Sequence, residues 1–128
     1  MDTNMEKLLH YVWQHRIYPL RALHTEDGAE VDIIDPGLHN FNAGPDFFNA
    51  KVKIGGQLWV GNVEIHERAS DWFRHQHQQD AAYNNVVLHV VSVADEQALT
   101  LDGKSLPQLV LTVPPEILRN YEELLHED

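Results

Sequence analysis

The chain has 128 residues, of which 43% are hydrophobic, enough for one buried core but not for two. The absence of cysteine excludes disulfides, thiolate metal sites and a cysteine nucleophile. Nine basic against 20 acidic residues give a formal net charge of −11, and the basic residues form no cluster, which counts against tight binding to nucleic acid. The sequence shows neither a signal peptide nor an apolar run of membrane-spanning length, so a cytoplasmic protein without a membrane partner is expected.

Hydrophobic periodicity and turn signals predict a single α/β (α+β) domain over residues 1–128. The expected elements, in chain order, are a helix at 4–18, strands at 20–24, 31–34, 47–54 and 58–66, a helix at 71–83, strands at 86–93 and 108–113, and a helix at 116–125. Three meandering strands followed by a helical crossover predict a mixed central sheet flanked by helices. The core order helix–strand–strand–strand–helix–strand covers about 4–93, and 101–125 adds a strand and a helix.

Two strands carry more specific expectations. The stretch 86–93 is almost continuously apolar, which is typical of a central strand covered on both faces. Gly61 interrupts the strand 58–66, and a glycine at such a place indicates a bulge or a close approach of another backbone.

The first candidate site lies at one end of a predicted hairpin. The turn Gly55-Gly56 pairs the strands 47–54 and 58–66, and this register places Asp46 beside Glu64 and His66. Glu64 and His66 are two apart in a strand, so they share a face. Two carboxylates and an imidazole are suitable ligands for a divalent cation. The alternative is an ion-paired strand end that holds no metal.

The element order and this motif together resemble the PD-(D/E)XK nuclease superfamily. Pro45-Asp46 and Glu64-Ile65-His66 match its pattern except that His66 stands where the superfamily has lysine. The resemblance implies a restriction-endonuclease-like fold, a catalytic Asp46 and Glu64 that bind Mg²⁺ or Mn²⁺, and nucleic acid as the partner. His66 is then expected to act as a base or a metal ligand, with Zn²⁺ as an alternative ion.

The segment that follows is rich in histidine. If 71–83 is one helix, residues two apart face different directions, so His75 and His77 are not expected to enter one site. His77 and Asp80 are three apart and are candidates for supporting or substrate-positioning roles. Trp72 and Tyr83 are expected to pack the helix on the sheet.

Two further polar residues are candidates for a supporting role or for contact with substrate. His89 lies in the apolar strand 86–93, where it is expected either to be a buried core residue or to reach the same site from the neighbouring strand. Asn42 belongs to the polar loop before Asp46, which either satisfies its own backbone groups or lines the site.

Several of these segments together resemble a bacterial family known as domain of unknown function 2851. The resemblance runs from about Leu8 to about Leu111. It is carried by the following motifs: Asn42-Ala-Gly-Pro-Asp46, Gly61-Asn-Val-Glu64-Ile-His66, Ser70-Asp-Trp72, His75-x-His77-x-x-Asp80-x-x-Tyr83 and Val87-Leu-His89-Val-Val91. The resemblance brings no established activity. It implies a longer protein, of which this chain is the N-terminal part or a short member.

Three functions follow from these observations. The first is a divalent-metal-dependent phosphodiesterase in which Asp46, Glu64 and His66 are the catalytic and metal-binding residues. The second is a catalytically inactive, nuclease-like module for binding or assembly, which the net charge favours. The third is a transition-metal hydrolase, which the nine histidines favour.

Overall fold

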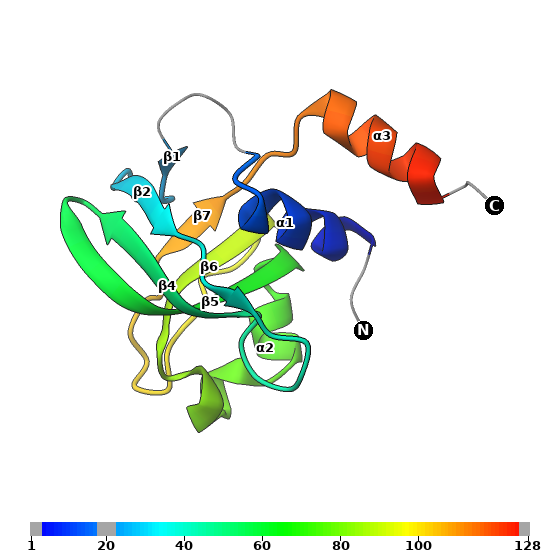
Figure 1. Cartoon of the computed structure of the whole chain (residues 1–128). Coiled ribbons are helices and arrows are strands. Elements are labelled where there is room, and N and C mark those ends of the chain that lie inside the picture. The colour runs from blue at the N-terminus through cyan, green and yellow to red at the C-terminus, as the bar shows by residue number, and fades with distance from the viewer. Residues whose placement is uncertain (1–3, 18–22, 126–128) are drawn as a thin grey trace.

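A seven-stranded mixed sheet dominates the computed structural model, which describes residues 4–17 and 23–125 (Figure 1). The helices and strands, in chain order, are α1 (Asn4–Gln14), β1 (Leu23–His24), β2 (Glu30–Asp35), β3 (Leu38–His39), β4 (Phe47–Ile54), β5 (Gln57–Arg68), α2 (Asp71–Arg74), the 3-10 helices η1 (His77–Gln79) and η2 (Ala81–Tyr83), β6 (Val86–Val93), β7 (Gln108–Val110) and α3 (Pro115–Leu125). The predicted α+β class, with a mixed central sheet flanked by helices, is confirmed.

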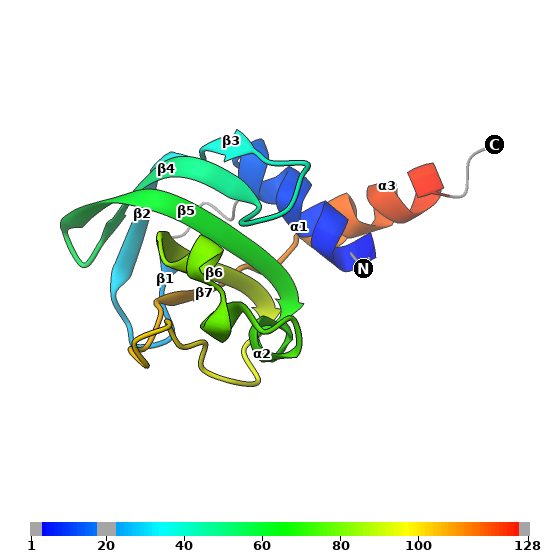
Figure 2. The same ribbon diagram turned by 90° about the horizontal axis from the view of Figure 1, so that it is seen from below.

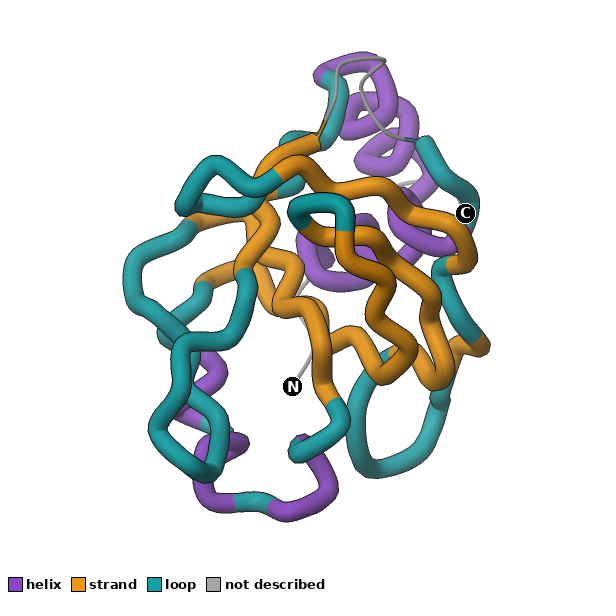
Figure 3. The backbone as a smooth tube through the Cα atoms, turned by 90° about the vertical axis from the view of Figure 1, so that its left-hand side faces the viewer, coloured by secondary structure: helices purple, strands orange, loops and turns teal. Residues whose placement is uncertain are grey.

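The strands follow the order β1-β2-β4-β5-β6-β7, and β3 pairs with β4. The pairs from β1 to β5 are antiparallel, whereas β5, β6 and β7 run parallel to one another. The sheet curls so far that its two edges meet (Figure 3), because Thr25 forms a bridge with Leu109 and the Glu26 backbone N–H donates to the Gln108 carbonyl at 3.0 Å. Gln108, the one polar residue of β7, is thereby brought close to the start of the sheet.

Helix α1 packs its apolar face on the sheet and supplies Leu8, Leu9, Val12 and Trp13 to the main core. It ends at Gln14, earlier than predicted, because Arg16 adopts a left-handed conformation (φ 56°) and the Ile17 N–H turns back to the Val12 carbonyl. This closing pattern is a common helix terminus. Residue 18 of the predicted helix and residues 20–22 of the predicted strand lie outside the described residues.

The predicted helix 71–83 is wrong. Helix α2 ends at Arg74, Gln76 is left-handed (φ 58°), and Asp80 is extended before η2, where its side chain accepts the Ala82 N–H. Apolar anchors lie only at the two ends of this segment, because Trp72 and Tyr83 belong to a second apolar cluster with Val86, Ala98 and Leu106. The polar residues between them have no apolar face that a continuous helix could bury.

Strand β6 and residues 61–66 of β5 are covered on both faces, as predicted for 86–93. Val63 and Ile65 belong to the core under α1, so Glu64 and His66 face the opposite side. A close backbone approach at Gly61 is also confirmed: an added Cβ there would lie 2.5 Å from Val87 Cγ1 and 2.6 Å from the Asn85 carbonyl oxygen.

Helix α3 extends from the side of the molecule, as Figures 1 and 2 show. It begins at Pro115, one residue earlier than predicted, and three of its side chains, Ile117, Leu118 and Tyr121, contact the main core. The preceding strand β7 is shorter than the predicted 108–113. None of the helices in the described ranges has the length and apolarity that crossing a bilayer requires.

Candidate functional site

A cleft of about 630 Å³ opens beside the edge of α1. Its walls come from four segments: residues 6–10 of α1, the loop 39–46, Glu64 and His66 of β5, and residues of 75–83. The predicted residues Asn42, Asp46, Glu64, His66, His77 and Asp80 all line it, whereas His89 does not. The structure thus brings most of the predicted site together, and the chemical role of these residues stays a prediction.

Asp46 and Glu64 meet across the β4–β5 hairpin. The Asp46 N–H donates to Glu64 Oε1 at 3.2 Å, and the Ile65 N–H donates to Asp46 Oδ2 at 2.8 Å. The turn pairs Ile54 with Gln57 as predicted, but a bulge between residues 47 and 50 shifts the register, so that Phe47 pairs with Val63. Asn49, with φ 58°, lies in this bulge.

Both carboxylates lie in a poorly solvated place. Burial raises the pKa of Asp46, and the neighbouring Glu64 adds to the rise through like charge, whereas His10 opposes it. Glu64 is only 4% exposed. Among residues 4–17 and 23–125, the basic side chains beside its carboxylate are the imidazoles of His66 and His77, with no lysine or arginine. A cation bound here would therefore compensate a buried negative charge.

His66 is held from both sides. Its Nε2 lies 3.2 Å from Glu64 Oε2, and its Nδ1 lies 2.7 Å from His89 Nε2. The Nδ1 of His89 lies in turn 3.0 Å from Gln108 Oε1. Burial lowers the pKa of His66 and of His89 to about 3 in each case, so both rings are neutral at pH 7. His89 is thus a buried residue behind the cleft that supports His66.

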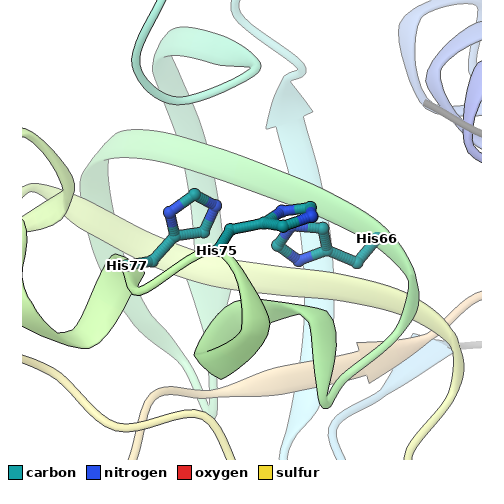
Figure 4. A group of neighbouring side chains, drawn as sticks. All are labelled: His66, His75 and His77. Atoms are coloured by element: carbon teal, nitrogen blue, oxygen red, sulfur yellow. The ribbon is translucent and has the colours of Figure 1, made fainter. Parts of the chain in front are cut away.

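The prediction that His75 and His77 do not enter one site is wrong, because both lie beside His66 (Figure 4). One ring nitrogen from each of the three histidines lies within 4.8 Å of the other two. The left-handed Gln76 ends the turn of α2 and lets two residues that are two apart in sequence enter one site. Each pair of the three rings has its centroids 5.2–5.4 Å apart.

His77 is fixed by two neighbours. Its Nε2 lies 2.8 Å from Glu64 Oε2, and its ring stacks on Tyr83 with centroids 3.8 Å apart. Asp80, the other candidate for a supporting role, caps η2, and its side chain forms no hydrogen bond or ion pair with His77 among the described residues. Burial raises the pKa of Tyr83, with Glu64 and Asp46 adding to the rise, so its hydroxyl stays protonated.

The loop before Asp46 is held by Asn40 rather than by Asn42. The Asn40 amide donates to the carbonyls of Ala43 and Pro45 at 3.0 and 2.9 Å, and its oxygen accepts the Asn42 N–H. Asn42 itself is exposed at the rim of the cleft. Its side chain can therefore contact a ligand. In the described hydrogen bonds of the loop, Asn42 takes part through its backbone.

Sequence reasoning missed His10 at the other end of the cleft, where it contacts Asp46 and His39, the first residue of the polar loop. His10 Nε2 lies 3.5 Å from Asp46 Oδ2, and His10 Nδ1 lies 3.1 Å from His39 Nε2. His10 projects from the buried part of α1 one turn after Glu6, which also lines the cleft. An acid and a histidine at i and i+4 in the first helix were the signal that could have identified this wall.

Comparison with known proteins places the chain in a family. The family model described as a protein of unknown function (DUF2851) matches residues 6–128, and the chain belongs to this family. No curated protein and no solved structure matches the chain.

Proposed function

We propose that the cleft of this DUF2851 protein is the active site of a divalent-metal-dependent hydrolase that cleaves phosphodiester bonds. The observation that carries the proposal is the meeting in one cleft of Asp46, directly before β4, with Glu64 and His66 of the adjacent strand β5. Support for the phosphodiester substrate comes from the resemblance to the PD-(D/E)XK superfamily, in which two carboxylates on such strands hold the ion. The parallel pairing of β5 with β6 after three antiparallel strands agrees with that resemblance.

The donor groups fit a divalent ion. Glu64 is buried with only imidazole side chains beside its carboxylate among the described residues, and an imidazole in its neutral form presents a lone pair to a metal. When bound, a divalent cation lowers the pKa of a coordinated water and stabilises the charge that develops on phosphoryl oxygens. Asp46, Glu64 and His66 would hold the ion in this proposal.

The remaining steps belong to side chains of the cleft. His66 is neutral and only its Nε2 faces the cleft, so this one lone pair either ligates the ion or accepts a proton from the attacking water, but not both. Tyr83 is protonated and lines the cleft, where its hydroxyl can donate a hydrogen bond to the substrate. Lys7, at the rim, can attract a phosphate group.

A second function is favoured by the charge of the cleft. Four acidic side chains, Glu6, Asp46, Glu64 and Asp80, line it together with a single lysine. Such a wall repels a polyanion unless bound cations compensate it. A non-catalytic module for binding or assembly is therefore the alternative function.

A hydrolysis assay separates the two functions. The full chain, freed of metal by chelation, is incubated with single-stranded DNA, RNA or bis(p-nitrophenyl) phosphate and with Mg²⁺, Mn²⁺ or Zn²⁺. We expect hydrolysis that needs the ion and that falls by about 100-fold or more in Asp46→Asn. The matched control Asp102→Asn, in an exposed turn, should keep the parent rate. If no combination of ion and substrate gives hydrolysis, the hydrolase proposal is wrong and the non-catalytic module is the remaining function.

A further inference from the structure

The hydrogen bonds around Gln108 fix which of its side-chain atoms faces His89. Gln108 is 2% exposed, its Nε2 donates to the Glu26 carboxylate and to the Glu96 carbonyl at 3.0 Å, and its Oε1 accepts the Ala98 N–H at 2.9 Å. An amide oxygen only accepts hydrogen bonds. The contact between Gln108 Oε1 and His89 Nδ1 at 3.0 Å therefore requires the hydrogen on His89 Nδ1.

The position of the hydrogen on His89 determines the position of the hydrogen on His66. A neutral imidazole carries one N–H, so the Nε2 of His89 is an acceptor. It lies 2.7 Å from His66 Nδ1, which must then be the donor. The hydrogen of the neutral His66 ring is thus on Nδ1, and its Nε2 presents a lone pair to the cleft.

The lone pair of His66 faces a carboxylate. The distance from His66 Nε2 to Glu64 Oε2 is 3.2 Å, and both atoms are acceptors when Glu64 is ionised. Two acceptors at this distance repel each other unless a cation or a proton lies beside them. His77 Nε2 lies 2.8 Å from the same Oε2, so it either donates a hydrogen to Glu64 or, like His66, faces a shared cation. His75 and His77 surround the same place with two more ring nitrogens.

We propose that His66, His75 and His77 bind one transition-metal ion of the Zn²⁺ class together with Glu64, and that His89 and Gln108 are positioning residues that hold His66 in its Nε2-ligating tautomer. Three imidazoles and a carboxylate suit Zn²⁺ and neighbouring ions, whereas Mg²⁺ prefers a set of oxygen ligands. A hydrogen-bonded acceptor behind a ligating histidine is a general feature of metal sites. The inference deepens the proposed function, since it names the ion class of the same cleft.

The direct test is metal binding by the metal-free full chain, measured by isothermal titration with ZnCl₂ and separately with MgCl₂. We expect one Zn²⁺ per chain, bound at least about 100-fold more tightly than Mg²⁺. His75→Ala should weaken Zn²⁺ binding by about 10-fold or more, since it removes one ligand. The exposed His15→Ala is the matched control and should bind like the parent. Tighter binding of Mg²⁺ than of Zn²⁺, or unchanged Zn²⁺ binding in His75→Ala, would overturn the three-histidine site.

The positioning role has its own test. His89→Gln keeps an oxygen that can accept from His66 Nδ1, whereas His89→Leu does not. We expect a loss of Zn²⁺ affinity of about 10–100-fold in His89→Leu and retention within a few-fold in His89→Gln. Equal losses in the two variants would refute the positioning role.

A measurement on the unmutated chain does not depend on whether these variants fold. Nitrogen-15 NMR of the metal-free protein should show the hydrogen of His66 on Nδ1 and that of His89 on Nδ1. A hydrogen on His66 Nε2 would overturn the inference.

The outcomes separate this inference from the proposed function. Zinc binding that depends on His75, without hydrolysis of any substrate, would support the proposed metal site and refute the proposed phosphodiesterase activity. Hydrolysis that Mg²⁺ supports equally in the parent and in His75→Ala would sustain the phosphodiesterase and remove the three-histidine site.

Discussion

His66 and Glu64 project from the same face of β5, and their side chains approach to 3.2 Å between Nε2 and Oε2. Both are buried, at 1% and 4% exposure. On an ordinary solvated strand such a pair contributes little to stability. Here His89 contacts the far side of the His66 ring, so the pair faces the cleft, where we propose that it binds a cation.

The stability of the cleft wall depends on Trp72. Its ring is buried in the second apolar cluster, and its Nε1 donates to the Leu99 carbonyl at 2.8 Å. We expect Trp72→Ala to lower the free energy of unfolding by about 3–5 kcal/mol, measured by urea denaturation. Trp59→Ala, at a ring that is 43% exposed, is the control and should cost much less. Equal losses in the two variants would contradict the packing role.

Gly61 controls the junction between β5 and β6. A methyl group there would lie within 2.6 Å of Val87 Cγ1 and of the Asn85 carbonyl oxygen, so the two strands must separate to admit it. Gly61→Ala should therefore lower the free energy of unfolding by about 1–3 kcal/mol. Val60→Ala, at an exposed neighbour, should have a much smaller effect in the same urea titration. A Gly61→Ala protein as stable as the parent would show that the junction is open.

The buried histidines predict a loss of stability in acid. The folded-state pKa of His66 and of His89 is lowered to about 3 from 6.5, so between these values the unfolded chain binds more protons than the folded chain. The free energy of unfolding of the metal-free protein should therefore fall as the pH is lowered from about 6.5 toward 3. Each histidine contributes up to about 1.4 kcal/mol per pH unit.

Asp46 affects the free energy of unfolding in the opposite direction. Its raised pKa means that the folded chain binds more protons than the unfolded chain as the pH falls, which stabilises the fold in acid. The test is the slope of stability against pH in a chelating buffer. His89→Gln should flatten that slope, and the exposed His15→Gln should leave it unchanged. An identical slope in the parent and in His89→Gln would rule out a buried neutral His89.

Tyr83 is predicted to act on the rate rather than on metal binding. Its ring stacks on His77, and Tyr83→Phe keeps that contact while it removes the protonated hydroxyl. If the cleft hydrolyses phosphodiesters, the rate should fall by about 10-fold or more, and the Zn²⁺ affinity should stay within a few-fold. A parent-like rate would show that the hydroxyl does not contact the substrate.

The hairpin that carries Asp46 and Glu64 could be predicted because the alternation of β4 and the Gly55-Gly56 turn specify one register. The bulge at Asn49 could not, because a left-handed asparagine within a strand leaves no periodic signal. Asp46 nevertheless reaches Glu64, since a shift of one residue at the strand end leaves the two side chains within contact.

The three-histidine cluster could not be predicted from the sequence for a different reason. Helical spacing separates His75 from His77, and only the left-handed Gln76 brings them together. The buried role of His89 in the apolar strand was predictable from its neighbours, whereas its contact with Gln108 depends on the parallel pairing of β6 with β7, which are far apart in the sequence. Local sequence patterns do not specify which strands pair when they are far apart in the chain.

Anomalous X-ray diffraction from crystals of the full chain soaked in ZnCl₂ tests the metal-binding claim most directly. We expect one peak inside the cleft, within about 2.0–2.1 Å of His66 Nε2 and of a ring nitrogen from His75 and from His77. A fully occupied peak elsewhere on the chain, or a cleft without any peak at saturating Zn²⁺, would contradict it.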